Sequence, residues 1–92
     1  MRKNKLPIID RKNFPYDLAM VYWEDIVGDS TITDYNETNN MHCALIKTEA
    51  YIFKKTKKYV HSFSSYQNDN GEIGFGDRNI YPRSVIKKML RI

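Results

Sequence analysis

Residues 18–26 carry the clearest alternation of hydrophobic and polar positions in the chain. They are rich in β-branched, aromatic and bulky side chains, and Gly28 follows them. Such a run, ended by a turn residue, is typical of a β-strand. Because successive side chains of a strand point to opposite faces, we expect Ala19, Val21 and Trp23 to share one face.

Two stretches in the middle of the chain predict an antiparallel hairpin. Residues 41–55 are too long for an average strand, so we expect one bent strand, or two, with a kink near residues 48–50. The basic segment KKTKK then forms the hairpin tip, and residues 59–67 return antiparallel. In the returning strand the alternation separates two sets of side chains: Val60, Ser62 and Ser64 on one face, and Tyr59, His61 and Phe63 on the other.

Turn-forming residues dominate the segments between these strands. Residues 28–40 are dense in Gly, Asp, Ser, Thr and Asn and predict a loop, with a brief strand at 31–33 as an option. Residues 68–77 predict a turn, and residues 78–82 predict a short strand that stops at its proline, which cannot donate to a ladder. The last ten residues predict either one or two amphipathic helical turns, or a 3₁₀ turn that leads into a final strand.

Five short strands joined by turns predict a small, mostly β domain. The pattern favours a five-stranded SH3-like or Sm-like barrel with a short 3₁₀ or helical turn near the C-terminus. Residues 1–17 hold two prolines and a basic cluster and predict an irregular or short-helical N-terminal arm, and residues 18–92 form the single barrel domain. A domain of 92 residues has a thin margin of stability, so we expect a homo-oligomer that covers its sheet edges.

The composition indicates a globular protein of a reducing compartment. A hydrophobic share of 41% argues against a disordered tail, and the single cysteine, Cys43, excludes an intrachain disulfide. The first ten residues lack the apolar run of a secretion signal, and no segment approaches the roughly 18 apolar residues of a membrane span. We therefore expect a cytoplasmic protein without a membrane partner.

Charge is distributed unevenly along the chain. Residues 1–12 hold five bases and one acid, residues 13–46 hold six acids and no Lys or Arg, and residues 47–92 hold ten bases and four acids. This pattern indicates either solvated faces of opposite sign or a dipolar surface that steers an anionic ligand or a charged protein.

The carboxylates do not form a catalytic pattern. Glu24 and Asp25 are neighbours on a strand and therefore face opposite ways, and the acids after them lack the spacing of a calcium-binding loop. Turn chemistry is the favoured interpretation of Asp29 and Asp34. The sequence thus predicts neither a catalytic residue nor a metal site, and no cofactor.

Cysteine, histidine and glycine residues give weak signals. His42 and Cys43 would point to opposite faces of a strand, and one cysteine with two histidines falls short of a closed zinc site. We expect Cys43 to be a small buried apolar residue. The glycines of residues 71–76 lack the order of a phosphate-binding loop.

Basic and aromatic residues together form the most suggestive pattern. Lysines at the hairpin tip are flanked by aromatic residues, and a second basic set follows near the C-terminus. Small barrels use aromatic faces to stack bases and cations to hold phosphate. Alternatively, the aromatic residues form core and the lysines protect a sheet edge. The candidate ligand-binding residues are Tyr51, Phe53, Lys54, Lys58, Tyr59, Arg78, Arg83 and Asp25.

Four segments together resemble a known family: VYWEDI, IKTEAYIF, KKYVHSFSSY and NIYPRSVIKKMLRI. They are similar to the small phage-encoded Sm-like or SH3-like accessory proteins, which carry V-x-W-x-D, T-x-G-Y/W and I-P-x-x-x-I motifs. The resemblance covers about residue 21 to residue 92. The matching residues are Trp23, Asp25, Thr48, Tyr51, Ile80, Pro82 and Ile86, while Ala50 stands where the family usually has glycine and Tyr81 is inserted in the last motif.

The resemblance implies a bacteriophage accessory protein without known catalysis, in the cytoplasm of a bacterial host. Some such proteins oligomerise and sequester nucleotide-derived immune signals, and others block defence enzymes directly. Our first hypothesis is therefore an inhibitor of host defence that binds a nucleotide-type small molecule. The second is a protein–protein inhibitor that mimics nucleic acid through Asp25, Asp29, Asp34 and Glu37. The third is a protein that binds single-stranded nucleic acid.

Overall fold

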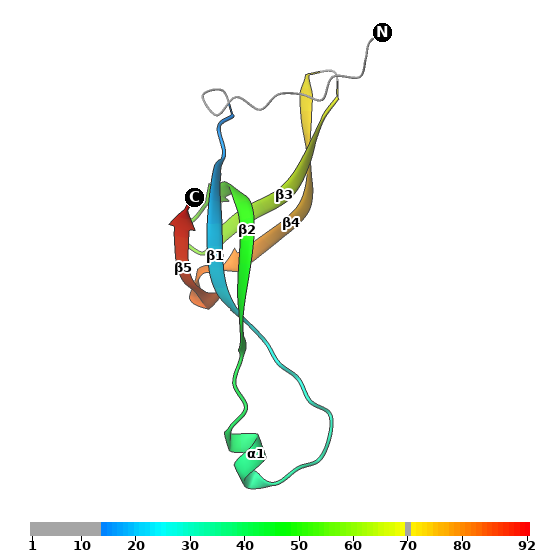
Figure 1. The fold of residues 1–92 in the computed structure, drawn as a ribbon, viewed down its shortest axis with the longest axis vertical. Coiled ribbons are helices and arrows are strands. Elements are labelled where there is room, and N and C mark those ends of the chain that lie inside the picture. Colours follow the sequence, from blue (N-terminus) through cyan, green and yellow to red (C-terminus); the bar gives the residue numbers. More distant parts are fainter. Residues whose placement is uncertain (1–13, 70) are drawn as a thin grey trace.

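The computed structural model describes residues 14–69 and 71–92 as five strands, a short helix and a 3₁₀ turn (Figure 1). The elements in chain order are β1 (Asp17–Asp25), α1 (Tyr35–Asn39), β2 (Ala44–Lys55), β3 (Tyr59–Asp69), β4 (Glu72–Pro82), η1 (Arg83–Val85) and β5 (Ile86–Arg91). The predicted mostly β class is confirmed. Most of the expected N-terminal arm lies outside the described residues, and its last residue already belongs to β1.

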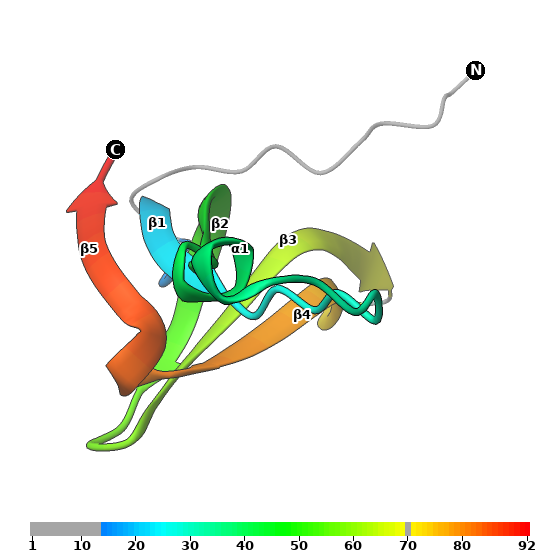
Figure 2. The ribbon, with the colours of Figure 1, turned by 90° about the horizontal axis from the view of Figure 1, so that it is seen from below.

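The five strands form one antiparallel open sheet in the order β4-β3-β2-β1-β5. β4 and β5 are its two edges. Seen from below, the sheet is strongly curved, with β5 at one end and the β3–β4 hairpin at the other (Figure 2). The 3₁₀ turn followed by a last strand was one of the two alternatives for the C-terminal segment, and it is the one that forms.

A small core lies on one face of the curved sheet. Val21, Val60 and Tyr81 are buried together, and five partly buried residues pack against them: Trp23, Ile52, Val85, Ile86 and Met89. The predicted face of β1 is confirmed, because Ala19 and Val21 are buried and Trp23 packs against that core. The Trp23 indole Nε1 donates to Thr48 Oγ1 at 3.0 Å, which satisfies its polar group inside an apolar contact.

The β3–β4 hairpin is longer than the turn-rich sequence predicts. Asp69 pairs with Glu72, so strand pairing continues through most of the segment that was expected to be a turn. Gly71, with φ at 85°, supplies the left-handed backbone that such a tight turn requires. The glycines farther along β4 did not prevent pairing, because β3 offers a continuous antiparallel partner; an added Cβ at Gly76 would come within 2.5 Å of Ser65 Oγ.

The connection between β1 and β2 projects away from the sheet and carries α1 (Figure 1). The optional strand at residues 31–33 does not form. Asp34 instead caps α1 by accepting from the Glu37 N–H at 2.9 Å, and Thr33 Oγ1 donates to Glu37 Oε2 at 2.5 Å. These local bonds resemble a capping box and favour a helix start over extended backbone.

Cys43 lies at the end of this connection and is exposed. The prediction of a buried thiol was therefore wrong. β2 begins only at the next residue, so Cys43 precedes the strand and has no sheet neighbour to cover it.

Candidate ligand-binding face

Tyr51 and Phe63 lie on the face of the sheet opposite the small core and belong to an aromatic cluster, which we define as Phe14, Tyr16, Tyr51, Phe53, Phe63, Tyr66 and Phe75. Phe63 is its centre, with only 1% of its surface exposed. Its ring stacks on Tyr51 with centroids 5.3 Å apart, and it meets Phe75 edge to face at 4.8 Å. Phe14 and Tyr16, which precede β1, also contact it. The aromatic cluster is thus a second hydrophobic cluster that joins the start of the described chain to β2, β3 and β4.

An irregularity in β2 aims Phe53 toward this cluster. Ile52 pairs with Ser62 and Lys54 pairs with His61, so Phe53 is an extra residue between the two pairs. Such a bulge redirects side chains and increases the local twist of the strand. β2 is a single strand, and its irregularity lies between residues 52 and 54 and not at the predicted residues 48–50.

A cavity of about 540 Å³ opens beside the aromatic cluster between β2, β3 and β4. This volume is within the usual range of small-molecule sites. The lining combines aromatic rings with one guanidinium and neutral polar groups: Phe53, His61, Ser62, Phe63, Phe75, Arg78, Asn79 and Ile80. Phe53 is 41% exposed, so part of its ring remains available to a ligand.

Arg78 is the cation of this cavity. It lies on β4 directly across from Phe63 of β3. Ser62, whose hydroxyl is buried without a hydrogen-bond partner among the described residues, alternates with Phe63, so its side chain lies on the face of the small core.

Three of the predicted ligand-binding residues lie at or beside this cavity. Phe53 and Arg78 line it, and Lys54 follows Phe53 and pairs with His61. Tyr51 is different, because it is half-buried between Phe63 and Phe14. Its ring is occupied by packing within the protein, as the alternative interpretation of the aromatic residues required.

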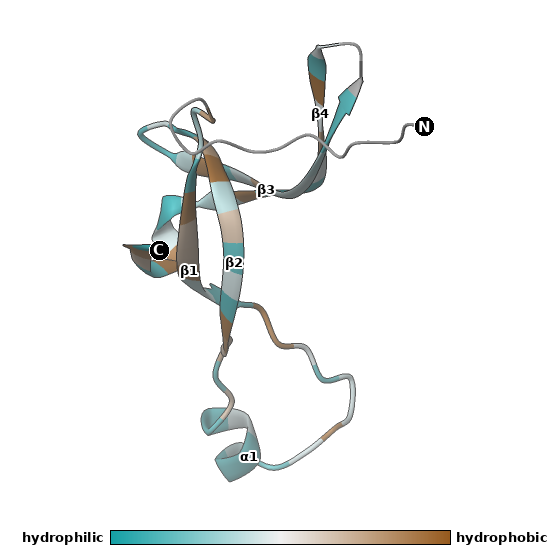
Figure 3. Cartoon of the chain, turned by 45° about the horizontal axis from the view of Figure 1, so that its top comes forward, coloured by the Kyte–Doolittle hydropathy of each residue, from teal (hydrophilic) through white to brown (hydrophobic). Residues whose placement is uncertain are grey.

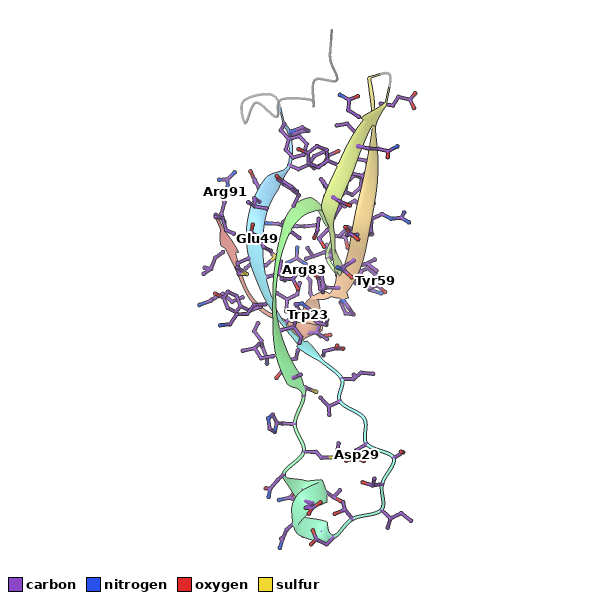
Figure 4. All side chains as sticks on the ribbon, turned by 45° about the vertical axis from the view of Figure 1, so that its right-hand side comes forward. Trp23, Asp29, Glu49, Tyr59, Arg83 and Arg91 are labelled. Atoms are coloured by element: carbon purple, nitrogen blue, oxygen red, sulfur yellow. The ribbon has the colours of Figure 1, made fainter. Side chains whose placement is uncertain are left out.

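Three more predicted residues lie around the β2–β3 hairpin tip. Tyr59 is 42% exposed and lies two residues before His61 on the same face of β3. Arg83 is held by the hairpin, since its Nε donates to Thr56 O at 2.7 Å and its backbone N–H donates to Lys58 O at 2.8 Å. Figure 4 shows Tyr59 and Arg83 in the same part of the sheet. These residues extend a basic and aromatic surface beyond the cavity.

Asp25 lies in a different part of the molecule. It pairs with Ala44 at the far end of β2, and nine residues of strand place it about 30 Å from Phe53. Its carboxylate accepts from the next backbone N–H, of Ile26, at 2.9 Å. The structure therefore does not bring Asp25 together with the other candidate ligand-binding residues.

The other acids of the second hypothesis lie in the β1–β2 connection, where Figure 4 marks Asp29. Asp29 accepts from the Thr31 N–H at 2.9 Å and from the Thr31 hydroxyl at 2.7 Å. These two bonds, the backbone one first, lower the pKa of the Asp29 carboxyl below its ordinary value. Within the described ranges, no three His, Cys, Asp or Glu side chains gather as a metal site would require.

Sequence reasoning missed several residues of the cavity. The alternation had placed His61 and Phe63 on one face with Tyr59, which was a usable signal. The sequence pattern did not indicate Phe75 and Asn79 as cavity residues. Phe75 lies in a segment that was expected to be a turn. Only the pairing of β3 with β4 brings them beside β3, where Phe75 pairs with Tyr66 and Asn79 with Ser62.

Comparison of this chain with protein-family models, with curated proteins and with solved structures finds no match. Among the helices of the described residues, none is long and apolar enough to cross a membrane.

Proposed function

We propose that this protein is a non-catalytic binding protein that takes up an anionic ligand with an aromatic ring, of the nucleotide type. The observation that carries the proposal is the cavity in which Phe53 and Phe75 lie beside Arg78. An aromatic face stacks on a base with little regard to its identity, and a guanidinium holds phosphate with two parallel hydrogen bonds. Lys54, Lys58 and Tyr59 extend the same chemistry along the rim.

The proposal includes the wider expectations of the resemblance. The protein would be a bacteriophage accessory protein that oligomerises through an SH3-like or Sm-like barrel and sequesters a nucleotide-derived signal of host defence. The antiparallel sheet in the order β4-β3-β2-β1-β5 supports the oligomerisation, because among the described residues neither β4 nor β5 pairs with a further strand at its outer edge.

The free energies of the expected contacts indicate a moderate affinity for a nucleotide-type ligand. One stacked base contributes about 1–3 kcal/mol, and a charge-assisted hydrogen bond about 1.5–3 kcal/mol. A micromolar complex requires about 8 kcal/mol, so the rim lysines or a second stacking contact must contribute as well. We therefore expect micromolar dissociation constants.

Calorimetry with a panel of mononucleotides, dinucleotides and cyclic nucleotides tests the proposal. Arg78→Gln should weaken the binding of the best ligand by about 10- to 100-fold, because the phosphate loses its charged partner. Lys87→Gln is the matched control, since Lys87 lies on β5 and pairs with Glu24 at 3.2 Å, away from the cavity. Binding that is unchanged in Arg78→Gln, or the absence of binding to any of these compounds, would contradict the proposal.

A single-stranded oligonucleotide provides a second arm of the experiment. Binding of the strand alone, with an affinity that falls steeply with salt, would favour the nucleic-acid hypothesis over the small-molecule one.

A further inference from the structure

Residues 26–43, which we call the acidic flap, carry large apolar side chains that are exposed to solvent. Ile26 is 88% exposed, Tyr35 is 79% exposed, and Ile32 is fully exposed. The flap carries three acids, Asp29, Asp34 and Glu37, and no Lys or Arg. Figure 3 shows hydrophobic segments in the connection between β1 and α1, away from the sheet.

The helix of the acidic flap lacks the packing that usually stabilises a short helix. α1 has five residues and none of them is buried. Isolated helices shorter than about 12–15 residues are marginal in water, and most helices in proteins depend on burial of an apolar face. The caps at Asp34 and Glu37 favour the helical turn but bury no apolar surface. The acidic flap therefore has the character of a surface that is covered by a partner.

A complementary surface exists on the same chain. Phe53, Tyr59 and Ile80 are large, exposed and apolar on the side of the sheet that holds the cavity. Lys54, Lys55, Lys57 and Lys58 surround the adjoining hairpin tip, and no acid occurs between residues 50 and 68. We call these seven residues the basic-aromatic face. Like the acidic flap, this face exposes apolar side chains. Its charge is positive, whereas the charge of the flap is negative.

The two surfaces cannot meet within one molecule. The acidic flap continues into β2 at Ala44, whereas the basic-aromatic face begins at Phe53. Nine residues of paired strand separate them by about 30 Å. Figure 1 shows α1 beyond one end of the sheet, remote from β3 and β4.

We infer that the acidic flap of one molecule docks on the basic-aromatic face of a second copy of this chain. The contact is heterologous, because two different surfaces meet, and it leaves one flap and one face free in each pair. Repetition therefore produces a ring or an open chain of molecules. The docked flap lies against Phe53, which also lines the cavity.

Sedimentation velocity of the full chain over a range of concentrations tests this inference without any nucleotide. The wild-type protein should associate. The flap variant Ile26→Ser/Ile32→Ser/Tyr35→Ser should associate roughly tenfold more weakly or not at all, because these exposed anchors are lost. Leu90→Ser, which removes an exposed apolar side chain of β5, is the matched control and should associate like the wild type.

A mixing experiment distinguishes two different surfaces from one symmetric contact. The face variant Phe53→Ser/Lys54→Glu/Lys58→Glu should also fail to associate alone, while keeping an intact flap. Mixed with the flap variant, it should form one-to-one heterodimers that grow no further. Circular dichroism and thermal unfolding show whether each variant remains folded, and a variant that unfolds is replaced by its single substitutions at Ile32 and Lys58.

Three results would overturn the inference. A wild-type protein that is monomeric at all concentrations excludes a second copy as the occupant, and capture of another protein by its flap would then assign the flap to that protein. Association that survives in the flap variant but is lost in Leu90→Ser assigns the contact to the β5 edge. A mixture of the two variants that stays monomeric excludes the heterologous contact. None of these results bears on the Arg78→Gln experiment.

Discussion

At the scale of single residues, Asp77 of β4 is notable for its backbone. Its φ is 49°, in the left-handed region, and no other described non-glycine residue has a positive φ. Aspartate is among the few residues that adopt this conformation at modest cost, whereas a β-branched side chain is strongly disfavoured there. The distortion lies between Gly76 and Arg78, so it helps to set the direction from which the Arg78 side chain enters the cavity.

Substitution at Asp77 should reveal this backbone preference. We expect Asp77→Val to lower the free energy of unfolding by about 1–2 kcal/mol, because valine is strained at positive φ. Asp77→Gly should change it by less than about 0.5 kcal/mol, since relief of strain is offset by the greater entropy of the unfolded chain. Urea unfolding measures both. Asn79→Val, on the same strand with negative φ, is the control and should not be destabilising; a similar loss in both valine variants would contradict the prediction.

The carboxyl of Asp29 gives a pH-dependent prediction. Its lowered pKa means that protons bind more weakly in the folded turn than in the unfolded chain. The turn is therefore stabilised at pH values above the ordinary aspartate pKa, and that stabilisation is lost as the pH falls through the folded value. Thr31→Val removes the hydroxyl donor but keeps the backbone donor, so the pKa should rise part of the way toward its ordinary value.

An NMR titration of the Asp29 side-chain carboxyl measures this change. Thr38→Val is the control, because the Thr38 hydroxyl donates to the backbone oxygen of Asp34 and to no carboxylate. A full return to the ordinary pKa in Thr31→Val would show that the backbone bond does not lower the pKa, and no change at all would show that the hydroxyl bond does not contribute.

At the scale of elements, the β2–β3–β4 part of the sheet has apolar side chains on both faces. Val60 and Tyr81 lie in the small core, and Phe63 lies in the aromatic cluster on the other side. Strands that are buried on both faces resist substitution on both. This explains how the sheet stays ordered although its core contains few fully buried side chains.

Alanine substitutions in the aromatic cluster should distinguish residues that stabilise the fold from residues that bind a ligand. We expect Phe63→Ala to lower the free energy of unfolding by about 3–5 kcal/mol, as for other buried phenylalanines. Phe53→Ala removes the same atoms from a ring that is 41% exposed, and should cost clearly less while it weakens ligand binding. Urea unfolding and calorimetry measure the two effects. Equal destabilisation by both variants would mean that Phe53 is a core residue and not part of a ligand site.

The same elements show what the sequence can predict. Alternation identified β1, the β2–β3 hairpin and the faces of β3, because these depend on a two-residue period and local turn residues. The aromatic cluster could not be predicted, since the bulge at Phe53 shifts the alternation and Phe14 and Tyr16 come from outside the strands. The candidate ligand-binding residues were predicted only from the presence of lysine, arginine and aromatic side chains close together in the sequence. The residues that share a cavity are set by the pairing of β3 with β4. The sequence did not predict this pairing, because the segment is rich in turn-forming residues.

At the scale of the whole molecule, the sheet edges and the acidic flap decide what the protein can contact. β5 carries two lysines and an arginine in six residues, a composition that discourages uncontrolled pairing at an edge. β4, at the other edge, carries glycines and the irregular backbone of Asp77. The acidic flap projects beyond one end of this sheet and exposes the single cysteine at its end.

The reactivity of the Cys43 thiol shows whether the end of the acidic flap is exposed or covered. In dilute native protein we expect a disulfide reagent to modify Cys43 without denaturant, at a rate within about threefold of that in urea, because the thiol is exposed. Absorbance of the released thiolate follows the reaction. At high protein concentration the rate should fall if the flap is covered by a second copy. A thiol that reacts only after denaturation would contradict its exposed position.

The pairing of β1 with β5 has a consequence for how the molecule assembles. Ala19 pairs with Arg91 and Trp23 with Ile86, so the two strands that meet are on the order of 70 residues apart in the chain. The β2–β3 and β3–β4 hairpins need only short loops and can form early, whereas closing the β1–β5 contact carries a large loop entropy. Refolding should accordingly take milliseconds to seconds, as in other β proteins with distant contacts. During that interval β1 presents an unpaired edge, so recovery of native protein from denaturant should improve on dilution.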